Sequence, residues 1–147
     1  MILLNGITGF YEKQNEPPKT DGKQFKRLCF SIINQNKGTI LNFQEPQIAS
    51  NFYSMEVKIS NKHFSILLNA HYPFLAFASA VNFGEINFIE VPHLKEEFSP
   101  FYIVLSTKVL NEPLLLKSEN ELNKAELNQI AYWKPERIGE VLFNHWD

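Results

Sequence analysis

The sequence has little cysteine and little glycine, and each shortage argues against a class of protein. Cys29 is the single cysteine of the 147 residues, so no disulfide can form within the chain, and this favours a reducing compartment. The six glycines are scattered and make neither a Gly-x-Gly-x-x-Gly pattern nor a P-loop. Standard nucleotide sites cradle phosphate with the backbone of such loops. We therefore expect no standard nucleotide site.

Long apolar runs are also missing. No stretch approaches the roughly 20 apolar residues that a helix needs to cross a bilayer. The chain opens with four residues, Met1 to Leu4, that break at Asn5-Gly6, so the basic and apolar regions of a secretory signal are absent. We expect a cytoplasmic protein with no membrane partner. The length and the 44% hydrophobic content predict a single α+β domain over residues 1–147.

The residues that usually carry catalysis or bind metals do not form a signature. The histidines are spread along the chain, and no Cys-x-x-Cys, His-Glu-x-x-His or Gly-x-Ser-x-Gly pattern is present. Cys29 falls on an apolar helical stripe, where core packing explains it better than catalysis. We expect no catalytic residue, no metal and no cofactor, and a binding protein rather than an enzyme.

One helix is clearly predicted near the N-terminus. Asp21 can cap it, Gln24 stands three residues later, and apolar residues then follow at helical spacing. That stripe is Phe25, Leu28, Cys29, Ile32 and Ile33. Gly38 is expected to end the helix in a left-handed conformation. A short strand is expected before the polar loop at residues 14–21.

A β-rich block follows this helix. Residues 52–60 alternate apolar and polar side chains, which predicts a half-buried strand, and residues 63–69 return as its hairpin partner. Residues 73–79 are apolar on both faces and predict a central strand. Residues 85–91 and 101–110 are expected as two more strands, with at most a helical turn between them.

The last part of the chain turns helical again. Asn123 and Glu126 form a capping box for a helix over residues 124–132. Residues 135–147 have helical periodicity, although a terminal strand is an alternative. Both tryptophans lie near this end, and we expect the segment to be docked on the sheet. The expected fold is an antiparallel sheet of four to six strands, with an N-terminal helix and two short C-terminal helices packed on one face.

Charge is distributed unevenly along the chain. The net charge is +3 over residues 1–74 and −5 over residues 75–147. An acidic surface attracts a basic partner. The contact residues predicted on this basis are Glu90, Glu96, Glu97, Glu119 and Glu121. Lys23, Lys26 and Arg27 share the outer face of the first helix, but the acidic net charge argues against nucleic acid as a partner.

The C-terminal segment resembles a known kind of protein. The residues that carry the resemblance are Ala125 to Ile130, Tyr132 to Pro135, Ile138 to Asn144, and Trp146-Asp147. They are similar to the C-terminal signature of small uncharacterised bacterial proteins, some of which look like the immunity proteins of polymorphic-toxin systems. The resemblance implies a cytoplasmic inhibitor that binds a toxin domain and blocks its active site. It assigns no individual contact residue.

Two functions lead after the sequence, and a third interpretation is a structural or oligomeric subunit, which would show a large apolar patch on the outer face of the sheet. The first is a non-enzymatic protein-binding module, an immunity-type inhibitor that neutralises a basic toxin domain through its acidic surface. The alternative is a small-molecule-binding protein or an enzyme, with a pocket on the concave face of the sheet near His71 and His63. A pocket that brings ionisable groups together would favour the alternative. The oligomeric state is left open.

Overall fold

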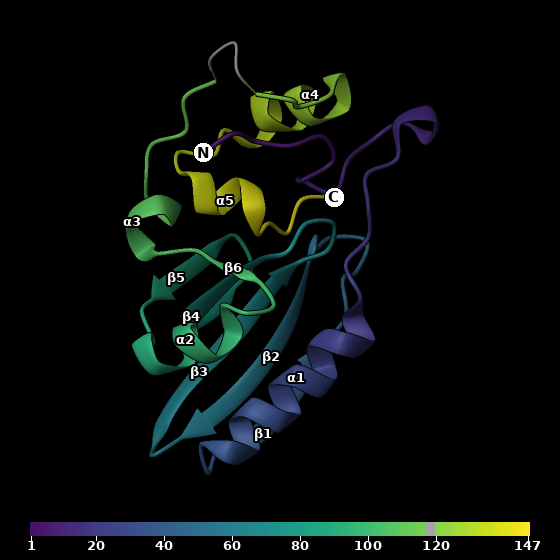
Figure 1. The fold of residues 1–147 in the computed structure, drawn as a ribbon. Coiled ribbons are helices and arrows are strands. Elements are labelled where there is room, and N and C mark those ends of the chain that lie inside the picture. Colours follow the sequence, from purple (N-terminus) through teal and green to yellow (C-terminus); the bar gives the residue numbers. More distant parts are fainter. Residues whose placement is uncertain (117–119) are drawn as a thin grey trace.

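A computed structural model describes residues 1–116 and 120–147. The chain is α+β, with a mainly antiparallel sheet and helices around it (Figure 1). The strands are β1 (Thr39–Gln44), β2 (Phe52–Ile59), β3 (Lys62–Asn69), β4 (Phe74–Asn82), β5 (Glu85–Ile89) and β6 (Ile103–Val104). The helices are η1 (Lys13–Asn15), α1 (Gly22–Gln35), α2 (Pro92–Phe98), α3 (Thr107–Leu110), α4 (Lys124–Trp133) and α5 (Ile138–Leu142).

The strands β1 to β5 form an antiparallel meander in chain order, and β6 pairs with β4 in parallel. Ser60 and Asn61 join β2 to β3, and both have a positive φ, at 47° and 66°. A two-residue turn of this kind matches the twist of the strands it connects. The predicted hairpin is therefore confirmed, and the six strands of the mainly antiparallel sheet fall within the predicted four to six.

The N-terminal helix forms as predicted. The Asp21 carboxylate accepts hydrogen bonds from the backbone N–H groups of Lys23 and Gln24, at 3.0 and 3.1 Å. The left-handed residue at its end is Lys37, with φ 57°, and not Gly38. A side chain on Gly38 would instead collide with Ile59 and Ile33, so this glycine serves close packing.

Three expectations for strands were wrong or incomplete. No strand is formed by the described residues before η1. In residues 101–110 only β6 is extended, because the Ser106 hydroxyl accepts a hydrogen bond from the N–H of Val109 and starts α3. Conversely, β1 was not predicted. Its register shifts between Ile40 and Asn42, and this bulge removes the alternation by which a strand is recognised.

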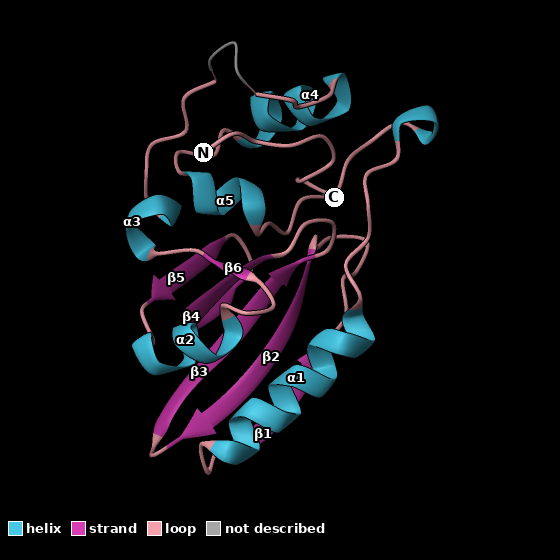
Figure 2. Cartoon of the chain, in the orientation of Figure 1, coloured by secondary structure: helices cyan, strands magenta, loops and turns pink. Residues whose placement is uncertain are grey.

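The helices pack on both faces of the sheet, contrary to the single layer that we expected. Residues from α1 and α2, among them Phe25 and Leu94, bury one face together with Met55 of β2. The opposite face packs against the C-terminal segment, with Leu67 of β3 against Phe143. In Figure 2, α1 and α2 lie in front of the sheet, and α4 and α5 lie beyond one end of its strands.

Buried polar side chains fasten the two ends of the chain to that end of the sheet. Asn69 Nδ2 donates to the carbonyls of Ile7 and Leu142, at 3.0 and 2.8 Å. Asn51 and Asn144 extend this network between the same segments. Buried amides need such partners, because an unpaired polar group is costly to bury. The expected docking of the last segment is confirmed, and α5 makes it helical over part of its length.

The Glu126 carboxylate provides a second connection between the ends. It is fully buried and accepts hydrogen bonds from Gly6 N, Thr8 N and Thr8 Oγ1, at 2.7, 2.9 and 2.6 Å. It also accepts from the N–H of Asn123 at 3.2 Å, which completes the predicted capping box of α4. One side chain therefore joins the start of α4 to the N-terminal segment.

Candidate functional site

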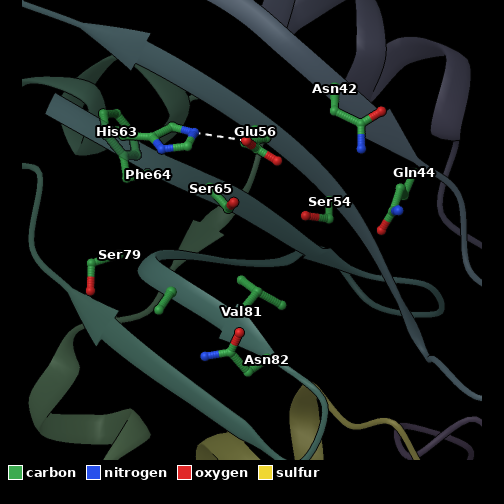
Figure 3. A pocket seen from close by; sticks show the side chains of 11 residues that line it. Asn42, Gln44, Ser54, Glu56, His63, Phe64, Ser65, Ser79, Val81 and Asn82 are labelled. Atoms are coloured by element: carbon green, nitrogen blue, oxygen red, sulfur yellow. Dashed lines mark hydrogen bonds and ion pairs between the residues drawn. The ribbon is translucent and has the colours of Figure 1, made fainter. Parts of the chain in front are cut away.

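The candidate site is a polar groove on the face of the sheet that α1 and α2 do not cover. Along β2, Met55 and Val57 face the helices, so Ser54 and Glu56 point to the other side. The C-terminal segment covers this other side only at the end that contains Phe52 and Leu67. Ser54, Glu56 and the neighbouring polar residues are left facing solvent (Figure 3).

Strand register aligns the polar residues across the sheet. Glu56 of β2 lies opposite Asn42 of β1 on one side and opposite Ser65 of β3 on the other. Gln44 pairs in the same way with Ser54. Side chains directly opposite one another in a sheet have Cβ atoms about 5 Å apart, so this row presents a dense set of hydrogen-bonding groups.

The end of β4 forms the opposite wall of the groove. The register of β4 and β5 shifts between Ala78 and Ala80, and such a bulge bends a strand. Ser79, Val81 and Asn82 then face the row on β1 to β3 across an open space (Figure 3). The groove has a volume of about 340 Å³.

His63 and Glu56 are in direct contact inside this groove. His63 Nε2 lies 2.7 Å from Glu56 Oε1, and the two side chains are 58% and 40% exposed. Exposed ion pairs of this kind contribute about 0–1 kcal/mol to stability, so the pair is not needed to hold the sheet. Among the described residues, the imidazole makes no hydrogen bond to a serine hydroxyl. The pair offers a ligand an oriented ring and a carboxylate.

The structure separates the two histidines that were expected to share a pocket. His63 lies near the start of β3 and lines the groove, whereas His71 follows the other end of β3. His71 Nδ1 lies 2.8 Å from the carbonyl oxygen of Pro18, and its ring packs edge-on against Tyr11 at 5.6 Å. His71 therefore holds the loop before α1, and the expected pocket near both histidines was wrong on this point.

Three of the predicted contact glutamates lie around α2, on the covered face of the sheet. Glu90 accepts a hydrogen bond from the backbone N–H of Thr107, and this bond lowers the pKa of its carboxyl group. Glu97 accepts a hydrogen bond from Asn36 Nδ2 at 2.8 Å, next to the end of α1. Glu96 makes no such contact with any described residue. Two of these three carboxylates thus have structural partners.

The other two predicted glutamates are not part of that group. Glu121 precedes α4, which lies at the opposite end of the molecule from α2 (Figure 1). Its backbone N–H donates to the carbonyl of Leu3 at 2.8 Å. Glu119 falls outside the described residues. The structure therefore does not bring Glu121 together with the glutamates around α2.

Sequence reasoning proposed a pocket on the sheet near His63 but did not name the polar row on β1 to β3, although part of its signal was visible. The alternation in residues 52–59 placed Ser54 and Glu56 on one face, and Ser65 lies on the matching face of β3. A strand pair of this kind predicts one polar face. What the pattern could not show was that the termini would cover only half of it.

Within residues 1–116 and 120–147, no three His, Cys, Asp or Glu side chains lie close enough together to hold a metal ion. None of the helices described combines the length and apolar character needed to cross a membrane.

Comparison with known proteins gives no relative. No protein-family model matches the chain, and neither a curated protein nor a solved structure matches it. The fold and the groove geometry therefore carry the functional argument.

Proposed function

We propose that the chain is a non-catalytic protein-binding module, an immunity-type inhibitor that holds its partner in the polar groove on β1 to β4. The proposal rests on one observation: part of one sheet face is left open and lined with amide, hydroxyl and carboxylate groups, while the terminal segments bury the other end of that face. An exposed concave surface without a structural task is available for recognition.

The groove chemistry supports a polar contact. Asn42, Gln44 and Ser54 can each donate and accept hydrogen bonds, so they can pair with the backbone and polar side chains of a partner. A typical interface has about ten hydrogen bonds and a wet, polar rim. Glu56 adds a negative charge to the floor of the groove, which suits a basic toxin domain.

The groove and the predicted glutamates around α2 lie on opposite faces of the sheet. Leu94 of α2 is buried against the same face as Met55, whereas Ser54 and Glu56 point to the other side. A single partner domain of ordinary size buries about 800 Å² on each side, so it does not cover both surfaces. Binding experiments can thus assign the contact to one face.

The test compares two equivalent substitutions, Asn42→Arg in the groove and Asn128→Arg on the exposed side of α4. Both positions are exposed, so both variants should fold. Partner proteins are recovered from the host by affinity capture and identified, and binding of the purified partner is then measured. We expect Asn42→Arg to abolish binding, because it places bulk and positive charge in the groove, while Asn128→Arg binds normally.

A third variant tests the acidic surface around α2. Glu96→Gln with Glu97→Gln removes two charges there and leaves the groove unchanged. Loss of binding in this double variant, with normal binding by Asn42→Arg, would move the contact to α2 and overturn the groove proposal. The toxin part of the proposal is checked by activity, since the recovered partner should lose its toxicity when the chain is co-expressed.

A small polar ligand is the second candidate, and the His63–Glu56 pair favours it. A groove of about 340 Å³ lies within the size range of small-molecule sites, and an oriented imidazole beside a carboxylate is a common recognition element. Monosaccharides and polyamines are suitable NMR probes. Saturable shifts at Ser54 and Ser65 that His63→Ala removes would support this candidate, and unchanged spectra would eliminate it.

A further inference from the structure

A second groove lies on the other side of the β4–β5 hairpin, separate from the polar groove. It has a volume of about 450 Å³ and runs between the hairpin, the end of α4 and the C-terminal segment. Both tryptophans of the chain, Trp133 and Trp146, line it. The proposed function does not use this groove.

Aromatic rings form much of its wall. The indole rings of Trp133 and Trp146 are stacked, with centroids 6.4 Å apart and planes at 4°. On the hairpin, Phe83 packs on His145 with ring centroids 5.3 Å apart, yet its side chain is 71% exposed. A phenylalanine this exposed is unusual at a hairpin turn, where polar residues are common. Its free ring face can stack on an aromatic ligand.

Two cationic side chains lie at one rim of the groove. Lys134 ends α4 and Arg137 precedes α5, and neither head group makes a hydrogen bond or ion pair with any described residue. The nearby carboxylate of Glu140 is already engaged, since its Oε2 accepts the backbone N–H groups of Glu136 and Arg137 at 2.6 and 2.8 Å. Glu85, the other acidic residue of the lining, belongs to the hairpin.

The backbone at Lys134 provides a way to separate binding from stability. Its φ is 51°, the left-handed conformation in which helices usually end with glycine. A side chain is disfavoured in that conformation, so a lysine here is less stable than glycine would be. Lys37 ends α1 in the same conformation, with φ 57°, so the backbone alone does not mark a site, but it makes glycine at position 134 a stabilising substitution.

We propose that this groove binds a small aromatic carboxylate, with the ring of the ligand against Phe83 and Trp133 and its carboxylate at Lys134 and Arg137. The volume falls in the range of roughly 300–1,000 Å³ that small-molecule sites occupy. Arginine holds a carboxylate through two parallel hydrogen bonds, and the stacking supplies apolar contact. The site is independent of the polar groove.

The two tryptophans make the test direct, because no other residue of the chain contributes indole fluorescence. The probes are N-acetyl-L-phenylalanine, which has ring and carboxylate, its amide, which has the ring alone, and N-acetyl-L-alanine, which has the carboxylate with no ring. Titration into the folded chain should give a saturable change in emission with the first probe. The other two probes should bind at least about threefold more weakly, as loss of an exposed charge contact or of a stacked ring predicts.

Variants then separate binding from folding. Arg137→Gln should weaken the binding of N-acetyl-L-phenylalanine at least about threefold. Its matched control, Lys124→Gln at the far end of α4, should leave that binding unchanged. Lys134→Gly should weaken binding of the probe. It should also raise the melting temperature by about 3 °C, because glycine adopts the left-handed backbone conformation without strain. A variant that is more stable yet binds less well cannot be explained by unfolding.

Two results would overturn the proposal. One is the absence of any saturable emission change with N-acetyl-L-phenylalanine, and the other is equal binding of this probe and its amide, which would remove the role of the cations. The tripeptide Gly-Gly-Phe tests the occupant. Binding several-fold tighter than N-acetyl-L-phenylalanine would assign the groove to the C-terminus of a peptide and overturn the small-molecule assignment.

Discussion

The two halves of one sheet face have opposite chemistry, although the same strands form both. At one end Phe52, Leu67 and Ala76 are buried under the terminal segments. At the other end Ser54 and Ser65, on the same strands, line an open groove. The comparison shows that strand alternation decides which side a residue faces, whereas the chain termini decide how much of that side is covered.

The covered half is stabilised by more than apolar contact. The amides of Asn51, Asn69 and Asn144 hold the terminal segments at the end of β3, and Glu126 holds the N-terminal turn. These groups lie at long sequence separations and fix where the cover stops. The open half buries no such groups, so its polar side chains remain available to bind a partner.

The largest difference in stability between the halves should appear when a side chain is shortened to alanine. Phe143→Ala removes a buried ring from the covered half and should lower the free energy of unfolding by about 3–5 kcal/mol. Ser65→Ala in the open half should change it by less than about 0.5 kcal/mol. Urea unfolding of both variants measures this, and similar losses would contradict the distinction between the halves.

Glu126→Gln should have the next largest effect. The amide keeps the shape of the carboxylate but replaces one acceptor oxygen by a donor, which then faces the backbone N–H groups of Gly6 or Thr8. We expect a loss of about 1–3 kcal/mol in unfolding free energy. Glu121→Gln, five residues earlier at an exposed site outside this network, is the control and should be neutral. Equal stability of the two variants would show that the Glu126 connection is dispensable.

Substitution of two tyrosines by phenylalanine should change the free energy of unfolding by smaller amounts and in opposite directions. The Tyr102 hydroxyl is buried without a hydrogen-bond partner among the described residues, and burial raises its pKa to about 12. Tyr102→Phe should leave stability unchanged or raise it by up to about 1 kcal/mol. Tyr72 donates its hydroxyl to the carbonyl of Asn5, so Tyr72→Phe should cost about 1 kcal/mol. Thermal unfolding of both variants is sufficient, and a clear loss in Tyr102→Phe would reveal a missing partner.

The pH dependence of the covered half should be the smallest effect. Burial between Phe52 and Phe83 lowers the pKa of His145 below its ordinary value of 6.5. The unfolded chain therefore takes up the proton first, and the His145 contribution to stability is lost as the pH falls below about 6.5. His145→Phe removes this titration. Chemical unfolding between pH 7 and pH 5 should show a shallower decline for the variant, and parallel curves would exclude the effect.

Local rules predicted much of the fold. The caps at Asp21 and Asn123 start α1 and α4, and the alternation of β2 fixed the faces of the central hairpin. β1 was not predicted, because its bulge places the apolar residues Ile40 and Phe43 three positions apart, whereas a regular strand repeats every two residues. The helical layer on the second face could not be foreseen, since it depends on contacts between residues as distant as Thr8 and Asn144.

The candidate site was less predictable than the fold. Charge counting singled out five glutamates, and of the four that the structure describes, three lie around α2 and one lies before α4. His63 was the one predicted site residue that lines the groove. The groove arises where strand alternation, the bulge in β4 and the limits of the terminal cover coincide, and only the first of these is written in the local sequence.

Chemical protection tests the central claim most directly. Burial raises the pKa of the Cys29 thiol, so this cysteine should resist maleimide, and one introduced thiol can be followed alone. Ser65→Cys reports on the groove and Glu96→Cys reports on α2, each with and without the bound partner. We predict that the partner slows labelling of Ser65→Cys and leaves Glu96→Cys unaffected. Unchanged labelling of Ser65→Cys in the complex would contradict the account.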